Sequence, residues 1–463
     1  MTVGMTLPEG WRAAVPEVEI PRHPLWIDAY HGAWDVFERW AERGGNPAEA
    51  ETAAAIAHYA RYAGAALPLH DWLDRQRETT PSPLHAWAEW SLFQVEGNVA
   101  RLARALPALR THYFQLQAAG RRGGSEDTMS GTPAGGPAEG LYYRSEGAHE
   151  IEEPEAQGAS TELSAQQTMG EPPKARSASI ALSAQQAMAA ECLAKIARAV
   201  GAEAEAEAFE GEWRGLQALS ERWCWDHSAH YYADCGVDGA PVPVKAVDGL
   251  WPLAAGTASA ERAGQVAAHL SEPAEFWRVH VFPSLSADHP RYSDRGYRRR
   301  GGVEPFQNYA IIKGLERYGL HELARRAADN HLTTLSHVYK ETQSHWDHYA
   351  PEYIEPAGDA RHDAAGTGVS AIALLLETVL GLHPDAHACT LHWRPALHEA
   401  HRVAGLPVGG ARVSLEVTPA AGRPGHLHAR VRSTAPLRLH VSTPEGEQWA
   451  EVEDGSELSV AAW

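Results

Sequence analysis

The sequence contains few cysteines and no long apolar run. Its four cysteines, Cys192, Cys224, Cys235 and Cys389, form no close pair and no CxxC motif. Neither a disulfide framework nor a zinc knuckle is therefore indicated. No stretch of 18 apolar residues occurs, and no basic start followed by an apolar segment opens the chain, so neither a membrane span nor a secretory signal is predicted. We expect a cytoplasmic protein.

Several common catalytic motifs are also absent, and basic residues are outnumbered. The chain has no GxxxxGK[ST], no GxGxxG after a strand, no GxSxG and no HExxH, which argues against the usual nucleotide-binding, hydride-transfer, α/β-hydrolase and zincin classes. Sixty acidic against 40 basic residues give a formal charge of −20. This acidic protein would repel phosphate backbones and anionic lipid, so we expect no nucleic acid and no membrane partner.

Metal binding is not indicated either. His227 and His230 are three residues apart, as are His345 and His348, but no third ligand stands at a recognisable spacing. We expect no metal and no organic cofactor.

What the sequence does contain is a series of helical patterns. Ten segments have apolar residues at helical spacing, and several neighbours meet at a glycine with almost no loop. They cover residues 24–43, 48–64, 83–97, 99–120, 180–201, 206–225, 259–270, 305–319, 320–341 and 368–381. Helical hairpins with long loops on one side predict a closed ring of helix pairs, whose longer loops build the site.

The residue pattern changes near residue 383. From there on, apolar and polar residues alternate in segments that are separated by Gly, Pro and Asp turns. We predict a mainly helical domain over 1–382 and a small antiparallel, sandwich-like β domain over 383–463. Residues 121–179 are expected to form a flexible insertion that begins rich in Gly, Ser and Pro. It holds LSAQQTM at 163–169, which recurs as LSAQQAM at 182–188 through local duplication or chance.

One loop concentrates acids and rings. HWDHYAPEYIEPAG, at 345–358, holds Asp347, Glu352 and Glu355 beside Trp346 and Tyr349. A glycosidase needs a carboxylate to activate water and a ring face to hold the sugar. A solvated acidic loop on an acidic protein is the alternative, and the residues alone do not decide between them.

A second cluster begins at Tyr297, in YRRRGGVEPFQNYAIIKGLERYG. Its arginines 298–300 precede a helix and suit an anion at the helix N-terminus or pairing with catalytic carboxylates. Glu304 lies at the start of that helix, where a negative charge favours the helix dipole without any further role.

Together these stretches resemble the α/α-toroid glycoside hydrolases of the family 63/37 type, in particular the mannosylglycerate or glucosylglycerate hydrolase-like branch. The likeness runs from about residue 81 to 400. It is carried by PLHAWAEWSLFQVEG, ALSAQQAMAAECLAKIARAVG, VKAVDGLWPLAAG and HWDHYAPEYIEPAGD, in the family order. The resemblance implies an (α/α)6-type toroid with a small C-terminal β domain. Ten helices are counted where the toroid has twelve, which leaves open whether the ring is complete.

The resemblance also implies an inverting mechanism with two carboxyls. The family's base lies in Trp-Glu-Asn-Tyr-Ala-Pro, which maps onto Trp346 to Pro351 and makes Asp347 the base, with Glu352 in reserve. The family's acid lies in Ser-Gly-Met-Asp, which this chain lacks. Glu150 stands nearest the expected spacing, with Glu152 and Glu153 as rivals.

The implied substrate is a small α-glucoside or α-mannoside. Its pocket would be lined or oriented by side chains from the matched stretches, namely Trp346, Tyr349, Arg300, Trp251, Tyr297, Glu304 and Lys245. Two alternatives stay open, a carbohydrate-binding pseudoenzyme and a toroid polysaccharide lyase that uses Tyr297 and His348. The sequence leaves a homo-oligomer open.

Overall fold

The computed structural model describes residues 7, 9–45, 50–64, 83–121, 140–142, 177–236, 238–452 and 456–461. Six helices of this part contact one another in sequence and close into an inner ring. Every residue of the last of them is buried, as are nearly all residues of the third. The inner helices are α2 (Ala50–Ala60), α4 (His85–Glu96), α6 (Ile180–Ala199), α8 (Trp251–Ala255), α10 (Pro305–Arg317) and η7 (Val369–Val379), the last wound as a π-helix.

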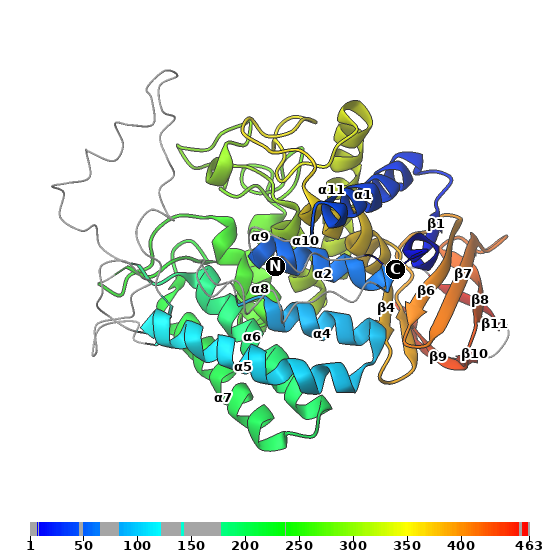
Figure 1. Ribbon diagram of the computed structural model, residues 1–463. Coiled ribbons are helices and arrows are strands. Elements are labelled where there is room, and N and C mark those ends of the chain that lie inside the picture. Colours follow the sequence, from blue (N-terminus) through cyan, green and yellow to red (C-terminus); the bar gives the residue numbers. More distant parts are fainter. Residues whose placement is uncertain are drawn as a thin grey trace.

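Five further helices of the described residues pack outside this ring. They are amphipathic; the one that follows α6, for example, buries only Ala206, Phe209, Leu216 and Ser220. The outer helices are α1 (Pro24–Glu42), α5 (Val99–Arg121), α7 (Glu203–Trp223), α9 (Ala260–Leu270) and α11 (His321–Thr342). In Figure 1 the blue α1 lies beside the yellow α11, so the start of the chain packs against its later part. None of the described helices combines the length and apolarity that a membrane crossing requires.

The predicted toroid is confirmed, and α8 corrects the expected helix count. All ten predicted segments are helical over most of their length. The stretch WPLAAG, which is not among the ten predicted helical segments, forms α8 and fills the inner position between α6 and α10. A five-residue helix with proline at its second position has too little periodicity to be recognised in a sequence. Gly314 makes the fit possible, because a Cβ there would lie 2.7 Å from the backbone nitrogen of Ala254.

The two mouths of the ring differ. The loops that follow the inner helices α4, α6, α8 and α10 are short, while long loops over 224–250, 271–304 and 343–368 precede inner helices. The long loops therefore gather at the N-terminal ends of the inner helices, and we call this side the long-loop mouth. The opposite side, at their C-terminal ends, is the short-loop mouth.

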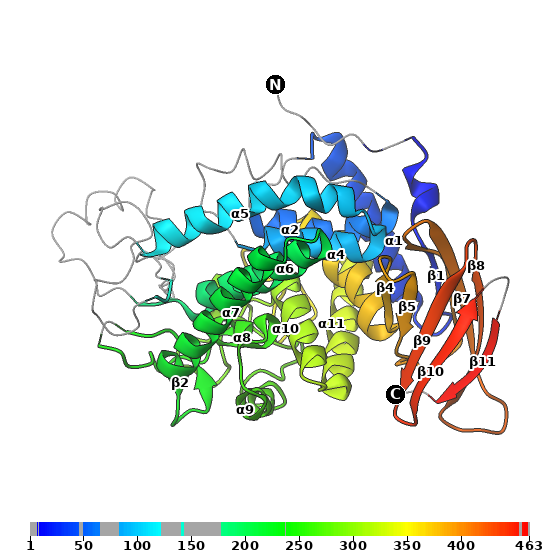
Figure 2. The same ribbon diagram turned by 90° about the horizontal axis from the view of Figure 1, so that it is seen from below.

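The C-terminal region forms two sheets, with orders β1-β6-β7-β8-β11 and β10-β9-β5-β4 (Figure 2). The pairs are antiparallel except that β5 runs parallel to β9, so the region is mixed rather than wholly antiparallel. Strand β1 comes from the N-terminal part of the chain and pairs with β6. The strands are β1 (Glu17–Glu19), β4 (Leu382–Asp385), β5 (Thr390–Trp393), β6 (His401–Val408), β7 (Ala411–Pro419), β8 (His426–Ser433), β9 (Leu437–Thr443), β10 (Gly446–Val452) and β11 (Ser456–Ala461).

Short elements complete the described fold. The strands β2 (Trp225–Asp226) and β3 (Tyr231–Tyr232) form a hairpin in the loop before α8. The short helical turns are η1 (Trp11–Ala14), η2 (Arg61–Ala63), η4 (Val247–Leu250), η5 (Arg298–Arg300) and η6 (Ala365–Thr367).

Candidate active site

Asp347 lies at the long-loop mouth, in the loop between α11 and the last inner helix. The loop is folded back on itself, since Asp347 N donates to Arg361 O at 3.0 Å and Trp346 pairs with His362. The start of the loop is also held to η6, because Thr367 Oγ1 donates a hydrogen bond to Trp346 O at 2.7 Å. These backbone contacts fix the position of the Asp347 carboxylate.

Both oxygens of that carboxylate accept hydrogen bonds. Oδ1 accepts from Arg361 N at 2.7 Å and lies 2.9 Å from His348 Nδ1, while Oδ2 accepts from Arg361 Nε at 2.8 Å. Burial alone would raise the pKa of Asp347, but the bonds from His348 and Arg361 outweigh it and lower this pKa to about 2. Asp347 is therefore ionised at neutral pH.

His348 is held between two carboxylates. Its Nδ1 faces Asp347 and its Nε2 lies 2.8 Å from Asp359 Oδ1. Burial would lower the pKa of His348, but these two acids outweigh it and raise the pKa to about 9. The ring is thus an imidazolium at neutral pH and has no free basic nitrogen.

The arginine cluster lies beside this loop. Val303 and Tyr349 exchange both backbone hydrogen bonds, at 2.9 and 3.0 Å, which places the segment after Tyr297 next to the Asp347 loop. Arg300 Nε donates to Arg291 O at 3.2 Å, and its guanidinium lies 5.9 Å from the Tyr297 ring. Glu304 immediately precedes α10 and accepts from Gln307 Nε2 at 2.5 Å.

Three of the four candidate ring residues, Trp346, Tyr349 and Trp251, differ in exposure. Trp346 is half-buried, with Nε1 donating to Thr342 Oγ1 at 3.1 Å. Tyr349 has no exposed surface, and its hydroxyl accepts from Trp346 N at 3.2 Å. Trp251 is also buried, with its ring 6.5 Å from that of Phe306. In this conformation only Trp346 of the three has a partly open side chain.

Glu352 is engaged by partners other than Asp347. Its Oε1 accepts from Arg278 Nε at 2.5 Å and from the Tyr292 hydroxyl at 2.7 Å. This pairing ties the tip of the loop to the segment that follows α9.

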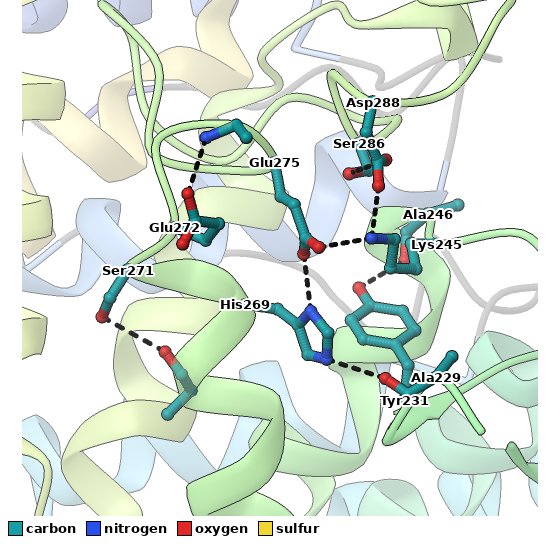
Figure 3. Close-up of polar contacts among 12 residues, drawn as sticks. Ala229, Tyr231, Lys245, Ala246, His269, Ser271, Glu272, Glu275, Ser286 and Asp288 are labelled. Carbon is teal, nitrogen blue, oxygen red and sulfur yellow. Dashed lines mark hydrogen bonds and ion pairs between the residues drawn. The ribbon is translucent and has the colours of Figure 1, made fainter. Parts of the chain in front are cut away.

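Lys245 is enclosed by acids. Figure 3 shows its ammonium group pointing to Glu275 and Asp288, while Glu275 also contacts Nδ1 of His269 at 2.5 Å. Burial would lower the pKa of Lys245, but the two carboxylates outweigh it and raise the pKa. Lys245 therefore joins the loop before α8 to the loop before α10, with both acids in direct contact.

The expected acid cannot be placed. Glu150, Glu152 and Glu153 lie outside the described residues. Within the described part of the chain, no three His, Cys, Asp or Glu side chains come together in a way that could hold a metal ion.

A small cavity at the same mouth adds two acids, Asp234 and Asp248, that were not among the predicted site residues. It has a volume of about 150 Å³ and is lined by Asp234, Asp248 and Arg299, among others. Asp248 attracts Arg299, which raises the pKa of this guanidinium further and outweighs its burial. Asp234 Oδ1 accepts from Ile180 N, at the start of α6, at 2.8 Å. Asp234 lies in the acid- and tyrosine-rich run YYAD. The composition of this run is the sequence feature that could have indicated Asp234 as a site residue.

A comparison with known proteins identifies the family of this chain. Residues 31–368 match the family model described as "Mannosylglycerate hydrolase MGH1-like glycoside hydrolase domain". The chain belongs to the MGH1-like glycoside hydrolase family. The resemblance predicted from the sequence is thereby confirmed.

Two proteins similar to this MGH1-like chain are longer than it is. An uncharacterised protein of Borreliella burgdorferi is 22% identical over 333 residues, which are 69% of this chain and 64% of that protein. A sialidase structure superposes with a TM-score of 0.65 and 13% identity, over 90% of this chain and 40% of that one. The chain thus spans less than two thirds of either protein.

A toroid with an assigned chemistry also superposes on the MGH1-like chain. The structure of the GH63 mannosylglycerate hydrolase from Thermus thermophilus, in complex with Tris and D-glycerate, gives a TM-score of 0.52 and 17% identity. It covers 75% of this chain and 99% of that one. At such identity the likeness shows the shared fold.

Proposed function

We propose that the protein is an inverting glycoside hydrolase that cleaves the α-glycosidic bond of a small glucoside or mannoside. Family membership supports hydrolysis of a glycosidic bond. The observation that carries the proposal is Asp347, an ionised carboxylate fixed at the long-loop mouth of the toroid. A base must be ionised to accept a proton from water, and Asp347 meets this requirement at neutral pH.

In this mechanism Asp347 accepts a proton from water as the water oxygen bonds to the anomeric carbon. The bond from that carbon to the leaving oxygen breaks, and a carboxylic acid on the other side of the sugar protonates this oxygen. We assign the acid to Glu150, on the resemblance alone. A carboxylate with a pKa near 2 is a weak base, so positioning of the water has to supply much of the rate.

The side chain of Arg361 is the partner of Asp347 that we expect to move when water binds. Its side chain is 77% exposed, whereas that of Asp347 is 22% exposed. Departure of this arginine would free Oδ2 for a water molecule, while the backbone nitrogen of Arg361 and the ring of His348 continue to hold Oδ1.

The substrate class rests on the mouth and on one relative. The Thermus thermophilus enzyme is a mannosylglycerate hydrolase crystallised with D-glycerate. We infer that this chain accepts glucosylglycerate, mannosylglycerate or a trehalose-like disaccharide. Trp346 and Tyr297 are assigned to contact the sugar and Arg300 to bind a polar group, whereas Tyr349 and Trp251 support the site from within the core. Lys245 and Glu304 hold the surrounding loops.

The test is hydrolysis of these three substrates by wild type and by two variants of one loop. Asp347→Asn should lower kcat by at least about a hundredfold, the usual loss of a general base. Glu355→Gln removes a more exposed acid of the same loop, paired with Arg295, and should leave kcat within about twofold. Equal rates for both variants would contradict the assignment of Asp347.

One observation favours a second candidate, a carbohydrate-binding protein with impaired catalysis. Both oxygens of Asp347 are engaged by Arg361 and His348. Calorimetric binding of a substrate without release of product over hours would support this candidate. The lyase has no such support, because the His348 imidazolium lacks a free basic nitrogen.

A further inference from the structure

A charged cavity lies at the short-loop mouth, on the other side of the ring from Asp347. Its volume is about 350 Å³, at the lower end of the range for small-molecule sites. It is lined by residues of α4, α6, α8 and α10, of η2 and η7, and of β4. The charged residues that line it are Arg61, Glu191, Lys195, Lys313, Arg317 and Glu377.

An aromatic layer separates this cavity from the long-loop mouth. Trp87 and Tyr309 line the cavity, with ring centroids 5.8 Å apart. Trp87 also contacts His58 at 4.1 Å and Phe306 at 5.9 Å. Because Phe306 precedes Tyr309 by nearly one turn of α10, these rings lie on the side of the cavity that faces the proposed active site.

The floor of the cavity is an ion network built around Glu377. This carboxylate accepts from Arg61 at 2.5 Å, from the Tyr62 hydroxyl at 2.9 Å and from the Tyr309 hydroxyl at 3.1 Å, and lies 3.3 Å from Lys313 Nζ. Arg61 is only 5% exposed, and its Nε has no partner among the described residues.

The rim remains open to solvent. Arg317 donates to both oxygens of Glu191 at 2.8 and 2.9 Å, and Lys195 reaches the same carboxylate at 2.9 Å. The side chains of Lys195 and Arg317 are 40% and 33% exposed. A small molecule can therefore meet these cations from outside before it contacts the floor.

The charged side chains that line the cavity indicate which class of ligand it binds. Four cations line the cavity against two carboxylates, and Glu316, which contacts Lys313 from outside the lining, is a third. This local excess of positive charge occurs in a chain of net charge −20, so the cavity attracts anions where the rest of the surface repels them. Tyrosine hydroxyls and Trp87 and Trp90 add partners for hydroxyl groups and ring faces. We propose that this cavity binds a small hydroxylated organic anion, a sugar acid or a sugar phosphate.

The first experiment is calorimetry at low salt with D-gluconate, glucose 6-phosphate and neutral D-glucose as probes. Wild type should bind at least one of the two anions and not glucose, and the anion preferred tells carboxylate from phosphate. Lys195→Gln should raise Kd at least fivefold, while Lys340→Gln, an exposed lysine of α11, should leave it unchanged. Absence of anion binding, or equal Kd for the two variants, would overturn the proposal.

A second measurement uses the unaltered chain and keeps the proposal falsifiable if Lys195→Gln fails to fold. Bound anion should slow hydrogen exchange in 188–199 and 309–317, the walls of this cavity. Slowing confined to the Asp347 loop, residues 345–365, would overturn it. Asp347→Asn should bind the anion as wild type does, so failure of the hydrolase proposal and failure of this one can be told apart.

Discussion

His348 provides a quantitative test of the electrostatics around the proposed base. Its ring lies between Asp347 and Asp359, at 2.9 and 2.8 Å, and its pKa is raised to about 9 from an ordinary value of 6.5. A pKa raised by folding stabilises the protein fully below pH 6.5, and this stabilisation is lost as the pH rises through about 9.

The magnitude follows from linkage. Between pH 6 and pH 8.5 a group with these two pKa values loses about 2 kcal/mol of its contribution to the free energy of unfolding. His348→Gln removes the titrating ring. The difference in stability between wild type and His348→Gln should therefore shrink by about 2 kcal/mol over this range, while other titrating groups cancel because both proteins contain them.

The assay is urea unfolding of both proteins at pH 6 and pH 8.5. His362→Gln is the matched control for loss of a histidine from the same loop, because the His362 side chain is 70% exposed. If the stability difference between wild type and His348→Gln is the same at both pH values, the two carboxylates do not hold His348 protonated. A protonated His348 would then not explain the low pKa of Asp347.

Three other changes test separate parts of the structure. Gly314→Ala forces a methyl group against the backbone of α8 and should cost ~1–3 kcal/mol of stability, whereas Gly264→Ala on α9 meets nothing within 4 Å and should stabilise by up to about 1 kcal/mol; unfolding midpoints that move alike would contradict the tight α8–α10 contact. Glu377→Gln leaves buried cations without their carboxylate and should lower stability by ~3–5 kcal/mol in urea unfolding, and a near-neutral effect would mean that the network contributes little. Arg361→Gln removes one of the groups that depress the pKa of Asp347, so the acid limb of the pH–rate profile should move to higher pH; an unmoved limb would exclude Asp347 as the group that titrates there.

Much of the toroid could be predicted because long helices carry strong periodic signals. Ten helical segments and the strand-forming character of the C-terminal region follow from apolar spacing. The helix α8 could not be found, since five residues cover little more than one turn. Strand β1 was missed for a related reason, because three residues near the N-terminus join a sheet only through β6, far along the chain.

The site was harder to predict than the fold. Composition drew attention to Tyr349, and the family resemblance to Trp251, but a sequence does not show which aromatic residues are buried in the core, and both are. The Arg61–Glu377 pair spans 316 positions of the chain, so nothing local indicates it. His348 was noticed as half of a histidine pair, whereas its observed partners are carboxylates brought close by the folding of one loop.

The stereochemistry of the first-formed product tests the central claim most directly. Proton NMR during hydrolysis of an α-linked glucosylglycerate or mannosylglycerate reports the anomer released before mutarotation. A base that activates water opposite the leaving group predicts the β-anomer from wild type and product formation at least about a hundredfold slower from Asp347→Asn. Initial release of the α-anomer, or the same rate from the variant, would contradict the account.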